Sequence, residues 1–248
     1  MPTKEWYKDW FNSSYYHKLY FERDETEAER FILKLLHHLQ PLNEARMLDV
    51  ACGRGRHSRF LASKGFDVTG IDISFDSIAY AKKFENDNLH FFQHDMRLPS
   101  WINYFDYAFN FFTSFGYFDT RREHDDAVRT IAQSIKPGGI LLFDYLNVHY
   151  VEERLVHNEV KKIGDTAYEI HRWHNDDFFF KRIIVTDAAL DQPIDFTEKV
   201  AKFSLGDFTD MLAYQHMQVI EVFGDYHLNP YNVRKTPRMI IVAKKMKR

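Results

Sequence analysis

The sequence predicts an α/β protein in which helices cover both faces of a mostly parallel sheet. Three observations favour this class. Short apolar segments alternate with amphipathic segments through Tyr145, a glycine-rich turn joins the first strand to the helix after it, and alternating polar and apolar residues then fill 151–203. The third observation predicts an antiparallel β insertion after the fifth strand.

The strands of the parallel sheet are predicted from short apolar segments bounded by turns. They cover residues 47–51, 67–72, 90–93, 105–111 and 140–145. A helix precedes the first strand, because its apolar residues recur at helical spacing, and further helices connect the strands. The expected helices cover 25–40, 55–64, 74–84 with Ser74 as N-cap, and 119–135, which Pro137-Gly138-Gly139 ends.

The pattern changes after residue 148 and returns near residue 205. Strands are expected at 168–173, 178–186 and 196–203, followed by a helix at 206–216 and an edge hairpin of 217–223 with 239–243. The chain therefore divides into three parts. Residues 1–148 hold an N-terminal segment and the first part of the core, 149–204 form the insertion and act as a substrate cap, and 205–248 return to the core.

Composition excludes several classes of protein. The net charge is −3, from 33 basic and 36 acidic residues, which disfavours a nucleic-acid partner. One cysteine excludes an internal disulfide, and neither a membrane-length apolar run nor a secretory signal is found, so a cytoplasmic location without membrane contact is expected. The 13 histidines show no three-ligand metal spacing, so no metal is expected.

The turn in Met47–Ser58 (MLDVACGRGRHS) indicates a nucleoside without phosphates. Gly53 and Gly55 match the first two glycines of a dinucleotide-binding turn, but Ser58 replaces the third. A carboxylate under the turn, Asp49, would repel a diphosphate. Asp72 ends the second strand, 19 positions after Gly53, where it could hold two vicinal ribose hydroxyls.

Five motifs in order resemble class I S-adenosylmethionine-dependent methyltransferases. They are Asp49-Val50-Ala51-Cys52-Gly53-Arg54-Gly55, Gly70-Ile71-Asp72-Ile73-Ser74, His94-Asp95-Met96-Arg97, the segment 106–118, and Lys136-Pro137-Gly138-Gly139. The resemblance covers about the first 150 residues. It implies a Rossmann-like seven-stranded sheet, S-adenosylmethionine as cofactor, and methyl transfer to a small-molecule acceptor by in-line displacement.

The resemblance also implies roles for individual residues. Gly53 and Gly55 would admit the methionine part to the backbone, and Asp49 would organise the turn or face the ammonium group. Asp72 would take the ribose hydroxyls, and Asp95 the adenine amino group, with Met96 on the ring. The remaining expected cofactor contacts are Ala51, Cys52, Ile73, Asn110, Phe111, Tyr15 and Tyr20.

Asn110 would point toward the methyl group, and Phe111, Phe112 and Thr113 would border the acceptor. This stretch lacks the Asn-Pro-Pro-Tyr motif of enzymes that methylate amino groups on bases or glutamine. Cys52 is expected to pack rather than to act as a nucleophile. An RNA or protein methyltransferase, and a non-catalytic S-adenosylmethionine-binding protein, remain the alternative functions.

Three questions stay open at this level. The N-terminal aromatic residues fit either a lid over the cofactor, with Tyr15 and Tyr20 facing it, or a strap packed on the sheet. Trp173 and Phe178–Phe180 fit either an acceptor pocket or a homodimer contact. No catalytic base stands out. The residues considered for it are Tyr117, His149, Tyr226 and His227.

Overall fold

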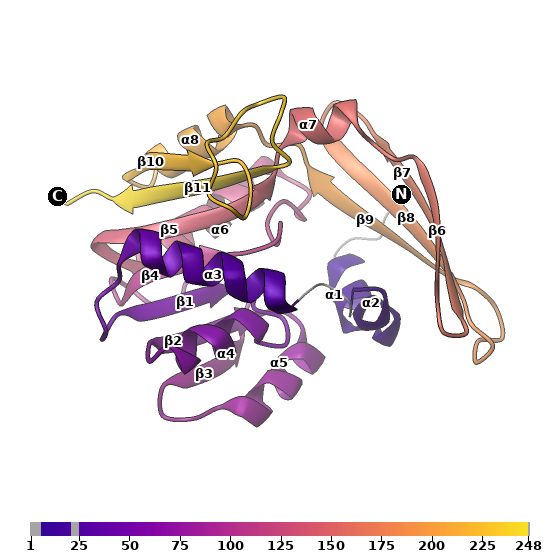
Figure 1. Cartoon of the computed structure of the whole chain (residues 1–248), viewed down its shortest axis with the longest axis horizontal. Coiled ribbons are helices and arrows are strands. Elements are labelled where there is room, and N and C mark those ends of the chain that lie inside the picture. Colours follow the sequence, from indigo (N-terminus) through magenta and orange to yellow (C-terminus); the bar gives the residue numbers. More distant parts are fainter. Residues whose placement is uncertain (1–5, 21–24, 248) are drawn as a thin grey trace.

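Two sheets organise the part of the chain that the computed structural model describes, residues 6–20 and 25–247. A seven-stranded sheet carries helices on both sides, and a four-stranded sheet extends away from it (Figure 1). Helices α1 (Trp6–Asn12) and α2 (Ser14–Leu19) lie where the two parts meet, and α1 contacts both the small sheet and helix α5 of the core. Within the described ranges, no helix is long and apolar enough to cross a membrane.

The large sheet has the order β10-β11-β5-β4-β1-β2-β3. Its members are β1 (Arg46–Val50), β2 (Asp67–Asp72), β3 (Leu89–Gln93), β4 (Phe105–Asn110), β5 (Ile135–Leu146), β10 (Met217–Phe223) and β11 (Arg238–Lys245). The first five strands pair in parallel, and β11 and β10 add an antiparallel hairpin at the edge. The predicted fold class and the edge hairpin are confirmed. The strand order reverses between β1 and β4, which is where open α/β sheets bind ligands.

Helices cover both faces because neighbouring residues of each central strand point to opposite sides. Leu142 of β5 packs in one apolar cluster with α3 and α4, whereas Leu141 and Phe143 pack in a second cluster with α6 and α8. The helices of the core and its connections are α3 (Glu25–Leu39), α4 (Arg56–Ser63), α5 (Phe75–Ala81), α6 (Arg121–Ser134), α7 (Val148–Glu153) and α8 (Leu205–Ala213).

Most predicted boundaries lie within two residues of the observed ones, and the differences have local causes. The helix expected at 74–84 is α-helical only to Ala81 and ends in a 3₁₀ turn, and Ser74 caps it by accepting a hydrogen bond from the Ser77 amide at 3.1 Å. The expectation that Pro137-Gly138-Gly139 separates a helix from a later strand is wrong. Strand β5 begins at Ile135 and absorbs these residues by a register shift against β4.

The insertion is an antiparallel sheet with the order β6-β7-β8-β9, as expected. Its strands are β6 (Asn158–Ile163), β7 (Thr166–His174), β8 (Phe178–Thr186) and β9 (Ile194–Ala201). Strand β6 was not predicted, because its sequence, NEVKKI, is polar and lies at an exposed edge. Helices α1, α2 and α7 were also not predicted.

His124 of α6 is a buried histidine enclosed by aromatic rings. Its ring packs against Phe115, Phe118 and Phe203 and is 1% exposed, and its Nδ1 lies 2.9 Å from the Thr120 carbonyl. Burial lowers the pKa of His124 from 6.5 to about 4, against the opposing effect of the backbone acceptors. As the pH falls, the His124 side chain of the unfolded chain therefore binds a proton first, whereas that of the folded protein stays neutral until about pH 4.

We expect this histidine to make the fold sensitive to acid. Between pH 6.5 and 4 the free energy of unfolding should fall by on the order of 3 kcal/mol through His124 alone, since stability decreases where the unfolded state binds more protons. Urea unfolding at a series of pH values should show a shallower pH dependence for His124→Gln than for the wild type. His37→Gln, at an exposed position of α3, is the control. Parallel curves for all three proteins would contradict the expectation.

Candidate active site

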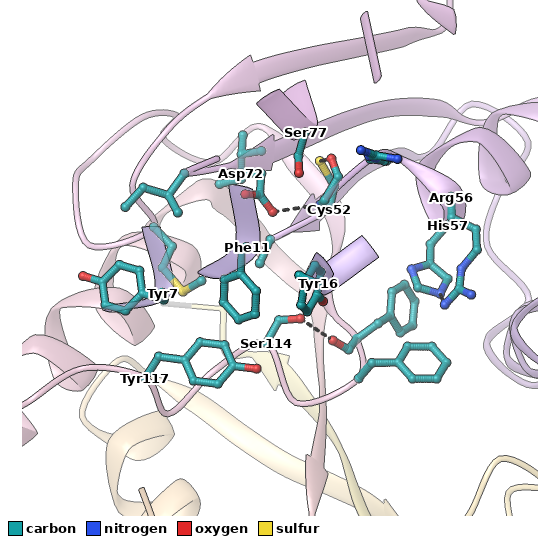
Figure 2. A pocket seen from close by; sticks show the side chains of 18 of the residues that line it. Tyr7, Phe11, Tyr16, Cys52, Arg56, His57, Asp72, Ser77, Ser114 and Tyr117 are labelled. Atoms are coloured by element: carbon teal, nitrogen blue, oxygen red, sulfur yellow. Dashed lines mark hydrogen bonds between the residues drawn. The ribbon is translucent and has the colours of Figure 1, made fainter. Parts of the chain in front are cut away.

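A cavity of about 270 Å³ lies at the carboxyl ends of the parallel strands. One side is formed by residues at the carboxyl ends of four neighbouring strands. They are 51–54 after β1, Asp72 at the end of β2 with Ile73 after it, 94–96 after β3, and Phe111 and Phe112 after β4. The other side comes from α1, α2 and β9. In Figure 2, Cys52 and Asp72 lie on one side of the cavity, Ser114 and Tyr117 lie on another, and the rings of Phe11 and Tyr16 project between them.

The turn after β1 brings backbone to the cavity wall. Gly53 has a φ of 55°, and a methyl group added to it would meet nothing within 4 Å, so its backbone is open on that side. Gly55 has a φ of 77°, but a Cβ there would lie 2.4 Å from Cζ of Phe91. The two glycines therefore have different tasks: Gly53 borders the cavity, whereas Gly55 packs against β3 outside it.

This difference predicts unequal costs for the same substitution. Gly55→Ala should lower the free energy of unfolding by about 2–4 kcal/mol, because left-handed strain adds to overpacking against Phe91. Gly53→Ala, the matched control, carries only the strain and should cost about 1–2 kcal/mol. Denaturant unfolding measures both values. Equal losses would show that the packing of Gly55 against Phe91 does not matter.

Asp72 holds the turn and also faces the cavity. Its Oδ2 accepts a hydrogen bond from the Gly53 amide and its Oδ1 accepts one from the Ser74 amide, each at 2.8 Å. Burial raises the pKa of Asp72, and the backbone donors oppose this effect. The carboxylate therefore joins the end of β2 to the glycine turn while bordering the same space.

Asp49 lies behind the turn rather than in the cavity wall. It is 1% exposed, and its Oδ2 accepts a hydrogen bond from Oγ of Ser58 at 2.6 Å. Burial raises the pKa of Asp49 to about 7, although the bond from Ser58 opposes this. Of the two roles expected for Asp49, these contacts match the organisation of the turn, because Ser58 belongs to the first turn of α4.

Asp95 and Met96 border the cavity beyond β3. Burial alone would raise the pKa of Asp95, but hydrogen bonds and charge from Arg97 lower it. Arg97 donates to Oδ2 from Nη2 at 2.6 Å and from Nε at 3.1 Å, and it also pairs with Glu123 at 2.8 Å. Asp95 is therefore an ionised acceptor held in a fixed orientation.

Asn110, expected to point toward the methyl group, lies inside the core. It is fully buried, and its Nδ2 donates to the Val50 carbonyl at 3.0 Å, so it joins β4 to β1. Phe111 and Phe112 border the cavity as expected, but Thr113 lies outside it, where its Oγ1 accepts a hydrogen bond from Nη2 of Arg238 at 2.9 Å. The wall at the end of β4 is therefore mainly aromatic, with Ser114 as its polar residue.

A buried ion pair fixes this wall. Phe112 and Thr113 have φ values of 56° and 58°, which non-glycine residues rarely adopt. The Phe112 amide donates to Oδ2 of Asp144, and the Thr113 amide donates to the Asp144 carbonyl, each at 2.8 Å. Arg238 donates to Oδ1 of Asp144 from Nε at 2.8 Å, and Tyr226 donates to Oδ2 at 3.1 Å. Asp144 is completely buried, so the whole group acts as a clamp on the strained loop.

The N-terminal aromatic residues take both of the positions considered for them. Tyr7, Phe11, Tyr16 and Tyr20 border the cavity. Trp10 instead packs on the small sheet, with its ring centroid 4.6 Å from that of Phe196, and donates from Nε1 to Glu198 at 2.7 Å. Tyr15 lies outside the cavity, and its carbonyl accepts a hydrogen bond from Tyr168 at 3.1 Å. The N-terminal segment therefore forms one wall of the cavity, and its contacts with the small sheet attach it to the insertion.

The aromatic residues Trp173 and Phe178–Phe180 do not border the cavity that the described residues form, so they do not line an acceptor pocket there. Strand β9 contributes Glu198 instead. Several cavity residues received no role from the sequence, among them Arg54, Arg56, His17, Ser77, Ser114 and Glu198. The helical spacing of Tyr16, His17 and Tyr20 was a usable signal for one shared face, but nothing near Glu198 marked it.

A model of the methyltransferase domain family matches residues 20–182 of this chain. The chain belongs to the class I S-adenosylmethionine-dependent methyltransferases. The match spans the glycine turn and the motifs after it, so the resemblance inferred from those motifs is confirmed. S-adenosylmethionine is accordingly the cofactor of the family to which this chain belongs.

Three known proteins show how far the similarity reaches. A putative methyltransferase of Bacillus subtilis, YqeM, is 38% identical over 41% of this chain and 42% of its own length. The dTDP-3-amino-3,4,6-trideoxy-alpha-D-glucopyranose N,N-dimethyltransferase of Streptomyces venezuelae is 34% identical over 40% of this chain and 41% of its own length. The chain thus matches about two fifths of the length of these relatives. An S-adenosylmethionine-dependent methyltransferase of Clostridium acetobutylicum has the same fold, with a TM-score of 0.79 and 18% sequence identity. The similarity covers 94% of this chain and 97% of that protein.

Proposed function

We propose that this protein transfers a methyl group from S-adenosylmethionine to a small-molecule acceptor. The observation that carries the proposal is Asp72, a carboxylate fixed by the Gly53 and Ser74 amides at the end of β2 and facing the cavity. A carboxylate in this place accepts hydrogen bonds from the ribose hydroxyls of a nucleoside.

The other residues of the cavity fit the rest of the cofactor. The open backbone at Gly53 admits the methionine part, and Ile73 and Met96 supply apolar contacts for the adenine ring beside the ionised Asp95. Ala51 and Cys52 complete the turn at the cavity wall. The pKa of Cys52 is raised well above its usual value by burial and by nearby carboxylates, so this thiol is unreactive and serves as a packing residue.

When bound, S-adenosylmethionine supplies a methyl group on a positively charged sulfur. The acceptor atom would bond to that carbon as the carbon–sulfur bond breaks, sulfur would keep the electron pair of the broken bond, and a proton carried by the acceptor atom would pass to water. The protein contributes orientation and the exclusion of water. Phe111 and Phe112 on one side and Phe11, Tyr16 and Tyr117 on the other give the acceptor region largely aromatic walls.

A small molecule suits this site better than a macromolecule. The walls close over the cavity from α1, α2 and β9, and the chain has a net charge of −3. The Streptomyces relative is named for an amino sugar, and this favours nitrogen as the acceptor atom. We assign the cofactor to the core, residues 1–148 and 205–248. We assign the role of covering the acceptor to residues 149–204, because Glu198 of this insertion borders the cavity.

The test combines binding and turnover. Calorimetry should show that the protein binds S-adenosylhomocysteine and does not bind NAD. Mass spectrometry should then detect the cofactor-dependent addition of a methyl group to members of a panel of amino sugars, amines and alcohols. Binding without turnover on any acceptor would favour a non-catalytic S-adenosylmethionine-binding protein, and binding of NAD alone would overturn the proposal.

A further inference from the structure

Strand β9 places a carboxylate in the cavity wall, away from the strand ends to which the cofactor is assigned. Glu198 borders the cavity, and its side chain is 16% exposed. Among the described residues, its partners come from α1, from the end of α2 and from β8, and none belongs to β1, β2 or β3. The other acids that border the cavity in this part of the chain, Asp72 and Asp95, are assigned to the ribose and the adenine. Glu198 is therefore a cavity carboxylate without a task in binding the cofactor.

Hydrogen bonds hold one oxygen of this carboxylate and leave the other able to accept. Oε1 accepts from Nε1 of Trp10 at 2.7 Å and from the hydroxyl of Tyr20 at 3.0 Å. Nζ of Lys181 lies 3.7 Å from Oε2, which is an ion-pair distance rather than a hydrogen bond. A carboxylate offers about four acceptor positions, so Oε2 can accept N–H groups from a ligand. Because two donors fix Oε1, the carboxylate is oriented before a ligand arrives.

A row of aromatic rings leads from Glu198 along the cavity wall. The ring centroids of Tyr20 and Tyr16 are 4.9 Å apart, and those of Tyr16 and Phe11 are also 4.9 Å apart. The centroid of Phe11 is in turn 5.4 Å from that of Tyr117. All four rings border the cavity, and Figure 2 shows those of Phe11 and Tyr16 projecting into it. Glu198 therefore lies at one end of the aromatic wall to which the acceptor is assigned.

A carboxylate beside aromatic faces suits an amino group. The N–H groups of an amine donate to a carboxylate, and these bonds are strongest when the amine is protonated. Ring faces attract the same cation. Lys181 shows this attraction within the protein, because its ammonium group lies 4.7 Å from the ring centroid of Tyr20 and 3.7 Å from Oε2 of Glu198. An alcohol has one donor and no charge, so it gains less at this place.

We propose that Glu198 determines the acceptor class, because its Oε2 hydrogen-bonds the amino group of a primary amine that packs on the aromatic wall. The inference rests on the proposed function and narrows its acceptor to an amine. It does so from contacts within this chain rather than from the name of a relative. Glu198 is a specificity-determining residue in this assignment, and no proton transfer is assigned to it.

Calorimetry on the protein saturated with S-adenosylhomocysteine tests this assignment with paired probes. Each pair differs only in an amino group against a hydroxyl: benzylamine and benzyl alcohol, cyclohexylamine and cyclohexanol, and glucosamine and glucose. The wild type should bind at least one amine about tenfold more tightly than its alcohol, which corresponds to about 1.4 kcal/mol. Glu198→Gln should abolish most of this preference, because the amide still accepts from Trp10 and Tyr20 but carries no charge. Asp195→Asn, which removes an exposed acid from the same strand, is the matched control and should keep the wild-type preference.

Lys181→Gln should act in the opposite direction. It removes the ammonium group that competes with a ligand for Glu198, and it keeps a donor for the hydroxyl of Tyr20. The preference for the amine should therefore increase. Thermal unfolding shows whether each variant is folded. If Glu198→Gln is not, Lys181→Gln decides the matter, and an unchanged preference in that variant would count against the proposal.

The outcomes separate this inference from the proposed function. If the wild type does not bind S-adenosylhomocysteine, the proposed function fails, and this inference fails with it. If the wild type binds it but prefers no amine over its alcohol, or if folded Glu198→Gln keeps the preference, Glu198 only attaches the N-terminal segment to the small sheet. A loss of affinity for S-adenosylhomocysteine in Glu198→Gln as large as its loss for the amine would place Glu198 in the cofactor site and overturn the assignment.

Discussion

Asp144→Asn is expected to lower the free energy of unfolding by about 3–5 kcal/mol, the largest effect of any substitution considered for this protein. The substitution leaves the guanidinium of Arg238 without its countercharge in an enclosed site. Arg238 bonds to Asp144 through both Nε and Nη2, and Asp144 is completely buried. Phe112, which is strained in the left-handed region, loses the carboxylate oxygen that accepts a hydrogen bond from its amide, whereas the Thr113 amide keeps the backbone carbonyl of residue 144.

An exposed ion pair in the same protein provides the control. Arg182 and Asp195 also form a bidentate pair, but their side chains are 48% and 46% exposed. Asp195→Asn should leave the free energy of unfolding close to that of the wild type, because water screens and replaces the contact. Denaturant unfolding compares the two variants, and similar losses would show that the Asp144 group does not act as a buried clamp. Adding Arg238→Met to Asp144→Asn should recover part of the loss, because no uncompensated charge then remains.

Asp72→Asn is expected to reduce the affinity for S-adenosylhomocysteine about 100-fold, since hydrogen bonds to a charged group contribute about 1.5–3 kcal/mol each. The amide keeps the shape of the carboxylate but cannot accept from the two ribose hydroxyls and from the Gly53 and Ser74 amides at once. Calorimetry of the folded variant measures the loss.

The control for this substitution lies at the other end of the same strand. Asp67 begins β2 with a side chain that is 42% exposed, and its Oδ2 is 3.7 Å from Nε of Arg46. Asp67→Asn should leave the affinity for S-adenosylhomocysteine unchanged. If Asp72→Asn also bound with wild-type affinity, the assignment of the ribose to this carboxylate would be wrong, whatever the variant did to turnover.

The sequence was most informative where structure depends on local pattern. The strands of the core and helices α3 to α6 were predicted within a few residues. The spacing of apolar residues and the capping residues specify these elements locally, without distant partners. Ser74 illustrates this, since it was expected to cap a helix and does so. The glycine turn and the ends of β2 and β3 were likewise recognisable, because parallel strands bring their carboxyl ends to one edge.

The far side of the cavity could be predicted only in part, as one of two positions for the N-terminal aromatic residues, because it depends on contacts between distant segments. Trp10 bonds to Glu198 across 188 positions, and Tyr168 bonds to the carbonyl of Tyr15 across 153 positions. Nothing in the sequence around Glu198 indicates such a partner. The contacts of Asn110 could not be predicted for a related reason: a polar residue at the end of β4 fits either a ligand or a neighbouring strand, and only the packed structure shows the bond from its Nδ2 to Val50.

The attachment of α1 and α2 to the small sheet bears on the order in which the protein acquires its parts. Loop closure over some 150 to 190 positions is entropically costly and slow, so long-range contacts of this kind form late in folding. Regions held by few such contacts are also the first to open in the native state. The side of the cavity formed by the core strands should therefore fold before the side formed by α1 and α2. Amide hydrogens of residues 6–20 should exchange with solvent well before those of β1, β4 and β5.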